Sequence, residues 1–467
     1  MSASALFLLA DLGSYPIVLW DESRLAVNAI EMYLTGPGLV TTYNFEPDLW
    51  NTKPPLLIWL MTASMTLFGA SEWALRLPSA LAALGTVAVT MVFTWRLTRS
   101  AAAAVLACAL LVASPGFYGV HAAATGDYDA LLTLFATSYL CVLFFTVHRR
   151  VPPLRWLLWA GVLIAAATLT KGVAGLIPGV GVGVYLLLVR RWTRPLITPR
   201  YLVAAGVVLF ATGVFYGLRE MAAPGYIQAV VQNELAGRYL ETLGGHPRPW
   251  SYYAGLLLRE TFSAGPLLLA VPLGFVVAAG RVRLGIVFAS CIAGAILLVF
   301  STSATKLPWY IVPAYPFLAT ALALSGFALA ARATQSGRAF VLAACAAAVV
   351  AVAAYRHEPL SAAAVPRQAR YGRVFADLHN RGVHTVSVVD GGVRNSEGFE
   401  AYSPRLRFYQ LMWRTRSFTV REVAADVAAL EKRPGTIVVT CDRRYVQVLR
   451  SRGTQVAALP GCISVRL

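Results

Sequence analysis

The sequence predicts an all-α polytopic membrane domain over residues 1–354 and a small soluble α/β domain over residues 355–467. Of the 467 residues, 58% are hydrophobic and 13% are charged, and the mean hydropathy is +0.63. An ordinary soluble domain carries about 25% charged residues. The first 354 residues hold 35 charged side chains, whereas the last 113 hold 27. The first stretch therefore has the composition of a lipid-soluble chain, and a single soluble globule is excluded.

Apolar runs in the first domain are long enough to cross a bilayer, which takes about 20 residues for a helix. We expect about eleven transmembrane helices of this kind. They lie near residues 3–20, 76–95, 101–119, 130–147, 155–170, 172–189, 201–217, 263–279, 284–300, 311–330 and 338–354. The run at 3–20 lacks the basic flank and the small-residue cleavage site of a signal peptide, so we interpret it as a span.

The loops between these runs segregate charge by sign. Alternate loops hold arginines and no acidic residue, at positions 96, 99, 149, 150, 155, 190, 191, 194, 200, 281, 283, 332 and 338. The other loops hold all twelve acidic residues between positions 12 and 354, namely Asp21, Glu22, Glu31, Glu46, Asp48, Glu72, Asp127, Asp129, Glu220, Glu234, Glu241 and Glu260. Because Lys and Arg concentrate in cytoplasmic loops, the acidic face is predicted to be extracytoplasmic, together with the C-terminal domain. The same rule accounts for the net charge of +18 without a nucleic-acid partner.

Two of the acidic-face loops are long and predict juxtamembrane helices. In the loop at 21–75, Lys53-Pro54-Pro55 precedes an apolar run that is too short and too aromatic for a normal span, so we expect it to lie along the interface. In the loop at 218–262, Pro249-Trp250-Ser251-Tyr252-Tyr253 leads into another apolar run and is typical of an aromatic anchor at headgroup level.

The C-terminal residues change to short strand-like runs at 384–389 and 436–440, with helix-like stretches near 367–380, 421–432 and 443–452. Asp390-Gly391-Gly392 is typical of a turn. Cys441 and Cys462 each lie at the edge of a strand-like run and could pair if the domain lies in an oxidising compartment. The cysteines at 108, 141, 291 and 345 fall in apolar runs, so we expect them to be core residues. No cysteine or histidine spacing predicts a metal site.

Two pairs of acidic residues are candidates for chemistry. Asp21 and Glu22 follow the first span, and Arg24 would face Asp21 if the stretch is helical, either as a local ion pair or as a general base beside a cation. Asp127 and Asp129 precede a span that starts at the same face. One of them could simply cap that helix, but capping does not explain both.

Lysine is rare in this chain, with four residues among 40 basic ones, so the lysines in the first domain stand out. Lys53, Lys171, Lys306 and Arg238 are cations of the acidic face from four separate segments. Each alone could lie against anionic headgroups. Cations and carboxylates gathered at one membrane surface are what a lipid phosphate or pyrophosphate requires.

The motifs also resemble a known family in their order. These motifs are Asp21-Glu22-x-Arg24, Lys53-Pro54-Pro55-Leu56 with Trp59, Phe68-Gly69, Arg76-Leu77-Pro78, Thr170-Lys171-Gly172 and Lys306-Leu307-Pro308-x-Tyr310-x-x-Pro313. Over about residues 15–330 the chain resembles the aminoarabinose-transferase and protein-mannosyltransferase group of GT-C glycosyltransferases. The resemblance implies a multi-pass enzyme of the bacterial inner membrane whose active site is extracytoplasmic.

By this resemblance the enzyme transfers a sugar, with inversion, from a polyprenyl-phosphate carrier to an acceptor. The acceptor would be lipid A or another cell-envelope glycolipid, a glycan, or a protein hydroxyl. Asp21 matches the first catalytic aspartate of the family, and the second falls at Asp127 or Asp129. The donor-phosphate and active-site groups fall at Arg24, Lys53, Lys171, Arg238 and Tyr310, and we add Lys306 to the phosphate-binding set on its position.

The chain departs from the family at a zinc site. Some aminoarabinose transferases have Glu directly before the Lys-Pro-Pro motif and His five residues before the arginine, and these bind zinc. Thr52 and Asn233 occupy those places here, so the sequence does not favour a zinc site of that kind, and a divalent metal bound by other residues stays an open alternative.

Two other classes of protein remain alternatives. A transporter or flippase should show an internal repeat and ionisable groups near the middle of the membrane, and the sequence shows neither. A scaffold that only displays the C-terminal domain would not need the acidic loops.

Overall fold

The computed structural model describes residues 9, 12–19, 21–149, 151–189, 199–237, 248–262, 264–332, 370–392, 403–424, 427–428 and 435–467. The chain divides into two compact units, which are described separately. The first contains residues 1–11, 47–60 and 76–358, and the second contains residues 12–46, 61–75 and 359–467. Two helices, α3 (Leu56–Phe68) and α4 (Glu72–Thr98), have residues in both units.

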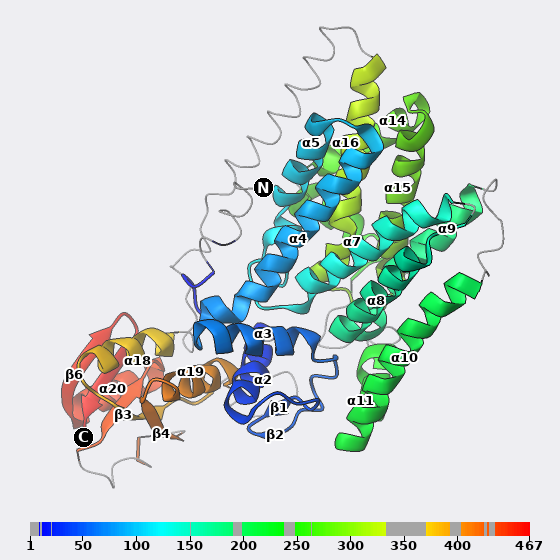
Figure 1. The fold of residues 1–467 in the computed structure, drawn as a ribbon. Helices are drawn as coiled ribbons and strands as arrows, with labels where there is room; N and C mark the ends of the chain where they lie inside the picture. Colours follow the sequence, from blue (N-terminus) through cyan, green and yellow to red (C-terminus); the bar gives the residue numbers. More distant parts are fainter. Residues whose placement is uncertain are drawn as a thin grey trace. The chain divides into compact units, whose positions relative to one another are not determined.

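The first unit is a bundle of apolar helices (Figure 1). After α4 its helices are α5 (Ala101–Val112), α6 (Pro115–Tyr118), α7 (Tyr128–Val147), α8 (Leu154–Lys171), α9 (Val180–Leu188), α10 (Pro199–Ala222), α11 (Tyr226–Val230), α13 (Tyr252–Leu256), α14 (Val271–Val277), α15 (Gly280–Thr302) and α16 (Tyr315–Arg332). Short 3₁₀ turns join several of them at Gly172–Gly175, Ile177–Gly179, Gly265–Ala270 and Pro308–Ala314, and π-helical turns lie at Val231–Gly237 and Leu257–Thr261.

Six helical segments of the described residues are long and apolar enough to cross a membrane: Glu72–Thr98, Tyr128–Val147, Leu154–Gly175, Pro199–Ala222, Gly280–Thr302 and Pro308–Arg332. A seventh would be the bent pair Tyr252–Thr261 and Gly265–Val277. Shorter helices occupy the predicted spans at 101–119 and 172–189, because α5 ends at Val112 and the 3₁₀ turns delay the start of α9. Half of the predicted span at 3–20, and all of that at 338–354, lies outside the described residues. Residues 12–19 form turns and extended chain, so the predicted helix is wrong there. The count of eleven stays a prediction.

The helix directions place the basic and acidic loops at opposite ends of the bundle. Arg96, Arg149, Arg200 and Arg281 lie at or beside the ends where α4 and α7 finish and α10 and α15 begin. Asp129 and Lys171 lie at the other end, in the first turn of α7 and the last turn of α8. We call this second end the site end of the bundle. The predicted segregation of charge is therefore present in the described part of the first unit.

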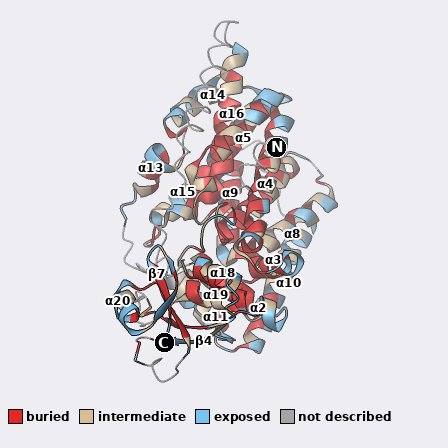
Figure 2. Cartoon of the chain, turned by 90° about the vertical axis from the view of Figure 1, so that its left-hand side faces the viewer, coloured by how far each residue is buried: buried red, intermediate tan, exposed pale blue. Residues whose placement is uncertain are grey.

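The core of the bundle lies between α4, α7, α15 and α16, where aromatic rings interlock. Phe93, Phe144 and Phe288 contact one another with centroids 5.0–6.3 Å apart. Figure 2 shows buried residues concentrated along α16 and α4. By contrast, α10 buries only 6% of its most apolar stretch, so in this structure most of its surface is available to lipid.

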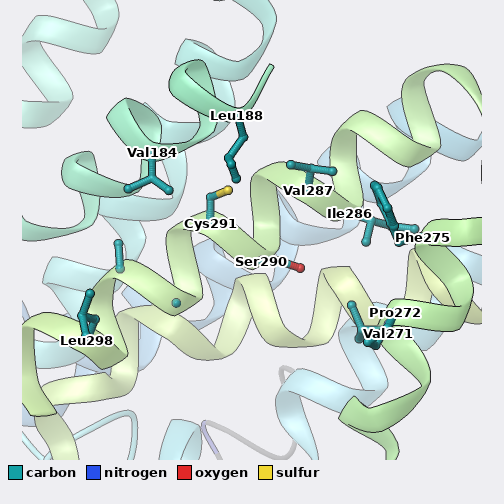
Figure 3. A pocket seen from close by; sticks show the side chains of 12 residues that line it. Val184, Leu188, Val271, Pro272, Phe275, Ile286, Val287, Ser290, Cys291 and Leu298 are labelled. Carbon is teal, nitrogen blue, oxygen red and sulfur yellow. The ribbon is translucent and has the colours of Figure 1, made fainter. Parts of the chain in front are cut away.

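An apolar cavity of about 470 Å³ runs beside α15 and is lined from α9 and α14 as well (Figure 3). Leu188, Phe275, Ile286 and Leu298 are among the side chains that line it, and none of the lining residues is charged. It therefore suits hydrocarbon, and the charged groups of the sequence analysis lie elsewhere.

The second unit contains a five-stranded mixed sheet in the order β4-β3-β5-β7-β6. The strands are β3 (Thr385–Val389), β4 (Thr419–Ala424), β5 (Ile437–Thr440), β6 (Thr454–Leu459) and β7 (Cys462–Arg466). β3 pairs in parallel with β4 and β5, whereas β7 is antiparallel to β5 and β6. The helices of this region are α18 (Tyr371–Asn380), α19 (Pro404–Arg414) and α20 (Arg443–Arg452). The small α/β domain predicted for the C-terminal residues is present.

Local predictions for this region have mixed outcomes. The helices near 367–380 and 443–452 and the turn at Asp390 are confirmed, the last by a hydrogen bond of 2.8 Å from the Gly392 N–H to Asp390 Oδ1. The helix near 421–432 is wrong over residues 421–424, which belong to β4 and pair with β3. Pairing along the edge of the sheet overrides a pattern that looks helical in isolation.

The same unit also contains α2 (Asp21–Thr35), the two-residue strand β1 (Thr42–Tyr43) and the first residue of β2 (Glu46–Pro47). Glu31 on α2 is fully buried and accepts hydrogen bonds from the Thr42 hydroxyl and the Phe45 N–H. Arg407 on α19 lies 3.5 Å from the other oxygen of this carboxylate. The carboxylate thus ties α19 to α2 within the unit.

Cys441 and Cys462 form a disulfide that joins the end of β5 to the start of β7. Closing a loop of 21 residues should stabilise the domain by about 3 kcal/mol. We expect the double variant Cys441→Ser/Cys462→Ser to lose hydrogen-exchange protection by that amount in β5 and β7 of the full-length chain. Cys108→Ser, at a free cysteine, is the control and should leave these strands unchanged. Equal protection in both variants would show that strand pairing alone holds this edge.

Candidate active site

The centre of the candidate site is a buried ion pair at the site end of the first unit. Lys171 Nζ lies 2.6 and 2.7 Å from the two carboxylate oxygens of Asp129. The exposed fractions of the two side chains are 10% and 4%. The pair joins the end of α8 to the first turn of α7, and both oxygens of Asp129 are taken up by one ammonium group.

Asp127 lies two residues earlier and has different partners. Its Oδ2 accepts a hydrogen bond of 2.5 Å from the Thr125 hydroxyl and lies 3.4 Å from Nδ1 of His121. The Ser79 hydroxyl donates to the Asp127 carbonyl over 3.1 Å. The Asp127 side chain makes no hydrogen bond that caps α7, so the capping interpretation is wrong for this residue.

Lys53 also lies near the start of α7, beside Tyr128. Its ammonium is 3.3 Å from Glu234 Oε1 and 5.6 Å from the centre of the Tyr128 ring. The preceding Thr52 donates its hydroxyl to the same Glu234 oxygen over 2.9 Å. Asn51 donates to the Tyr128 hydroxyl over 3.0 Å. The segment before α3 is therefore held against α7 and against the π-helical turn that carries Glu234.

Tyr226 fixes the backbone of this segment. Its hydroxyl donates to the Thr52 carbonyl over 2.8 Å, and its ring stacks on that of Tyr216. Burial raises the pKa of Tyr226 well above its ordinary value, so the hydroxyl keeps the proton that it donates. A π-helical turn such as the one after α11 is frequent at functional sites.

Tyr310 and Lys306 precede α16. The Lys171 ammonium lies 5.6 Å from the centre of the Tyr310 ring, which brings Tyr310 to the ion pair. Trp309 stacks on His121 with ring centres 3.7 Å apart, which ties the same turn to Asp127. The Lys306 ammonium instead donates to the Ser303 carbonyl over 2.5 Å, within its own loop.

The first unit thus brings together five predicted site residues: Lys53, Asp127, Asp129, Lys171 and Tyr310. Lys306 lies in the loop before α16, four residues before Tyr310. Asp21 and Arg24 belong to α2 of the second unit, where the Arg24 guanidinium lies 3.7 Å from the Tyr43 ring centre. Arg238 lies outside the described residues.

The residues at the family's zinc position do not suit a zinc ion. Thr52 offers a hydroxyl, which is bonded to Glu234, and Asn233 offers an amide. Zinc in proteins takes thiolate, imidazole and carboxylate ligands. The hydrogen bond from Thr52 to Glu234 instead links the two segments that carry these positions, and we derive no step through a metal.

Sequence reasoning missed Glu234, Tyr226 and His121 as site residues. The sequence identifies Glu234 only as one of the twelve acidic residues of the predicted extracytoplasmic face. No local motif distinguishes it from the others. His121 lies six residues before Asp127 and has a φ of 65°, a conformation that requires the fold to hold it. Contacts of this kind depend on helix packing, which the spacing of residues does not reveal.

Comparison with known proteins gives consistent matches. The family model described as dolichyl-phosphate-mannose-protein mannosyltransferase matches residues 52–216. An undecaprenyl phosphate-alpha-4-amino-4-deoxy-L-arabinose arabinosyl transferase 2 from Pseudomonas fluorescens is 30% identical over 72% of this chain and 61% of its own length. An uncharacterised protein from Aquifex aeolicus is 27% identical over 66% of this chain and 59% of its own. The matched part thus spans about three fifths of these two relatives.

Solved structures extend the likeness to the fold. Crystal structures of ArnT from Cupriavidus metallidurans, in the apo state and bound to undecaprenyl phosphate, both match with a TM-score of 0.68. They cover 99% of this chain and 96% of ArnT, at 19–20% sequence identity. The fold and the charged site end define a polytopic membrane protein of the GT-C type. The chain is similar to the aminoarabinose-transferase group of GT-C membrane glycosyltransferases.

The buried ion pair gives a direct test of the site's construction. Asp129→Asn leaves the Lys171 ammonium buried without its counter-ion, so we expect the free energy of unfolding to fall by about 3–5 kcal/mol. The double variant Asp129→Leu/Lys171→Met should recover most of that loss, because no charge remains unpaired. Unfolding in detergent micelles measures both.

The control is the surface pair of Asp377 and Arg381, whose atoms lie 2.9 Å apart in an exposed position. Asp377→Asn should change stability by no more than about 1 kcal/mol. If Asp129→Asn were equally mild, the ion pair would not be holding α7 and α8 together.

Proposed function

We propose that the chain is an inverting glycosyltransferase that moves a sugar from a polyprenyl-phosphate carrier to a cell-envelope glycolipid, such as lipid A, at the extracytoplasmic face of the bacterial inner membrane. The observation that carries the proposal is the gathering of Lys53, Lys171 and two aspartates at one end of a bundle with the ArnT fold. The names of the relatives support a polyprenyl-phosphate donor.

The charges suit the chemistry of such a donor. As the bond between the anomeric carbon and the phosphate oxygen breaks, negative charge develops on the departing polyprenyl phosphate. Fixed ammonium groups in a partly dry site stabilise that charge more in the transition state than in the ground state. Lys53, Lys171 and Tyr310 suit this role, and the sequence adds Arg24, Arg238 and Lys306 as further candidates.

A carboxylate is needed when the acceptor is a hydroxyl. The hydroxyl oxygen attacks the anomeric carbon from the face opposite the phosphate, and a base takes its proton. We assign this role to Asp21 on the family resemblance. An acceptor phosphate is already ionised, and Asp21 would then orient the acceptor or support Arg24.

We assign the second carboxylate of the family to Asp127 rather than Asp129. Both oxygens of Asp129 are bound by Lys171, so the negative charge of Asp129 is already balanced by this ammonium group. Asp127 has one oxygen bound by a neutral hydroxyl and a histidine beside it, which leaves it able to bind a substrate hydroxyl. Asp129 then acts by holding Lys171 in place.

The proposed location has two supports. The arginine-rich ends of the helices lie opposite the site end, as the preference of basic loops for the cytoplasm requires. The disulfide between Cys441 and Cys462 suits an oxidising compartment such as the periplasm.

A second candidate function is transfer to a protein hydroxyl. The family model that matches residues 52–216 is described by that activity, and the same site chemistry would serve it. The acceptor in a transfer assay separates the two candidates, because donor binding is common to both.

Transfer from a labelled polyprenyl-phosphate sugar tests the catalytic assignments. With a membrane extract as acceptor, we expect Asp21→Asn, Asp127→Asn and Lys53→Ala each to reduce the rate at least about a hundredfold. Asp377→Asn, a carboxylate on the surface of α18, is the matched control. Wild-type rates in Asp21→Asn and Lys53→Ala would remove both assignments.

Glu234 gives a separate prediction about donor binding. Its carboxylate neutralises Lys53, so a phosphate must compete with it. Glu234→Gln removes the competing charge but keeps an oxygen for the Thr52 hydroxyl. We expect this variant to bind undecaprenyl phosphate about three- to tenfold more tightly in nanodiscs. Weaker binding would mean that Glu234 helps to hold the ligand instead.

A further inference from the structure

Arg219 is a buried cation that the sequence analysis did not single out. It lies on α10, whose buried residues are Phe215 and Arg219 alone. These two residues are four apart and so share one face near the end of the helix. The exposed fraction of Arg219 is 2%. A helix with so little buried surface therefore places a guanidinium group inside the protein.

The guanidinium has no hydrogen-bond partner for either terminal nitrogen within the described chain, and both nitrogens are shielded from solvent. Among the described residues, the carboxylates of Asp48 and Glu220 act electrostatically on this guanidinium. Asp48 Oδ1 accepts from the N–H groups of Trp50 and Asn51. Glu220 accepts from the N–H groups of Gly225 and Ile227 over 2.8 and 2.7 Å. Both carboxylates are therefore engaged with the backbone.

Arg219 contacts the same tyrosine that positions the Lys53 segment. Its guanidinium carbon lies 4.4 Å from the centre of the Tyr226 ring, whose hydroxyl binds the Thr52 carbonyl. Thr52 directly precedes Lys53. Both positive groups thus lie around one tyrosine at the site end of the bundle.

We propose that Arg219 is a phosphate-binding residue of the active site, whose two free nitrogens bind oxygens of a substrate phosphate beside Lys53. The proposal rests on the proposed function and adds a residue to it. A buried charge without a hydrogen-bonded partner costs free energy, and a bound anion removes that cost. The planar guanidinium matches two phosphate oxygens at once, which a lysine cannot do.

The phosphate has two sources. One is the polyprenyl phosphate of the donor, and the other is a phosphate on the acceptor. The chemistry at Arg219 is the same for both, so the experiment needs one arm for each.

Binding in phosphatidylcholine nanodiscs provides the test with the full-length chain. The first arm compares undecaprenyl phosphate with undecaprenol, and the second compares lipid A with its dephosphorylated form. We expect Arg219→Gln to weaken binding of the phosphorylated ligand about ten- to a hundredfold in one arm, with the phosphate-free ligand unchanged. The arm that responds identifies the source of the phosphate.

Arg283→Gln is the matched control, because Arg283 makes a cation–π contact at the same 4.4 Å, with Phe275, at the opposite end of the bundle. It should bind both ligands as the wild type does. Arg219→Lys keeps the charge and should lose about three- to tenfold, which provides a second measurement if the glutamine variant is unstable.

The outcomes separate this proposal from the proposed function. Wild-type affinity in both arms for a stable Arg219 variant overturns the proposal and leaves Arg219 as a residue that only packs on Tyr226. If Lys53→Ala loses undecaprenyl phosphate in the same assay, the proposed function stands without Arg219. If the wild type binds undecaprenyl phosphate no more tightly than undecaprenol, and lipid A no more tightly than its dephosphorylated form, then both the role of Arg219 and the proposed function are wrong.

Discussion

Charges buried among apolar helices need partners, and this constraint shapes the site end of the first unit. Bringing an ammonium or a carboxylate out of water costs several kcal/mol unless an opposite charge and hydrogen bonds compensate. Lys171 meets Asp129, and Lys53 meets Glu234. Each pair joins segments that are far apart in the chain. The contacts that lower the cost of burying these groups are therefore also the contacts that position the end of α8, the start of α7 and the Lys53 segment.

The arrangement of these charges has a direct consequence for binding. A phosphate that enters meets a lysine already held by a carboxylate, and an arginine at Tyr226 whose two terminal nitrogens have no hydrogen-bond partner in the described part of the chain. Binding would then exchange one anionic partner of Lys53 for another and supply hydrogen bonds to these two nitrogens of Arg219. The apolar cavity beside α15 contains no charged lining residue, so it can take only the hydrocarbon part of a lipid. Polar chemistry and lipid contact are thus separated within one bundle.

The sequence predicts much of this because composition and spacing carry it. Charge density separates the membrane region from the α/β region, and the positions of the arginines and acids predict the two ends of the bundle. Lys53, Lys171 and the Asp127-Tyr128-Asp129 segment are recognisable from motifs. Glu234 and Arg219 are not, because their roles come from the packing of α10 and the π-helical turn. The strand at 419–424 was missed for a similar reason, since its partner lies some 30 residues earlier in the chain.

The central claim is that a substrate phosphate binds at Lys53 with carboxylates at hand. A cryo-EM map of the full-length chain with bound undecaprenyl phosphate tests it most directly. The account predicts phosphate density within hydrogen-bonding distance of the Lys53 ammonium, a broken contact between Lys53 and Glu234, and the Asp21 carboxylate lining the same pocket. Phosphate density away from Lys53, with the Lys53–Glu234 contact intact and Asp21 tens of ångströms away, would contradict it.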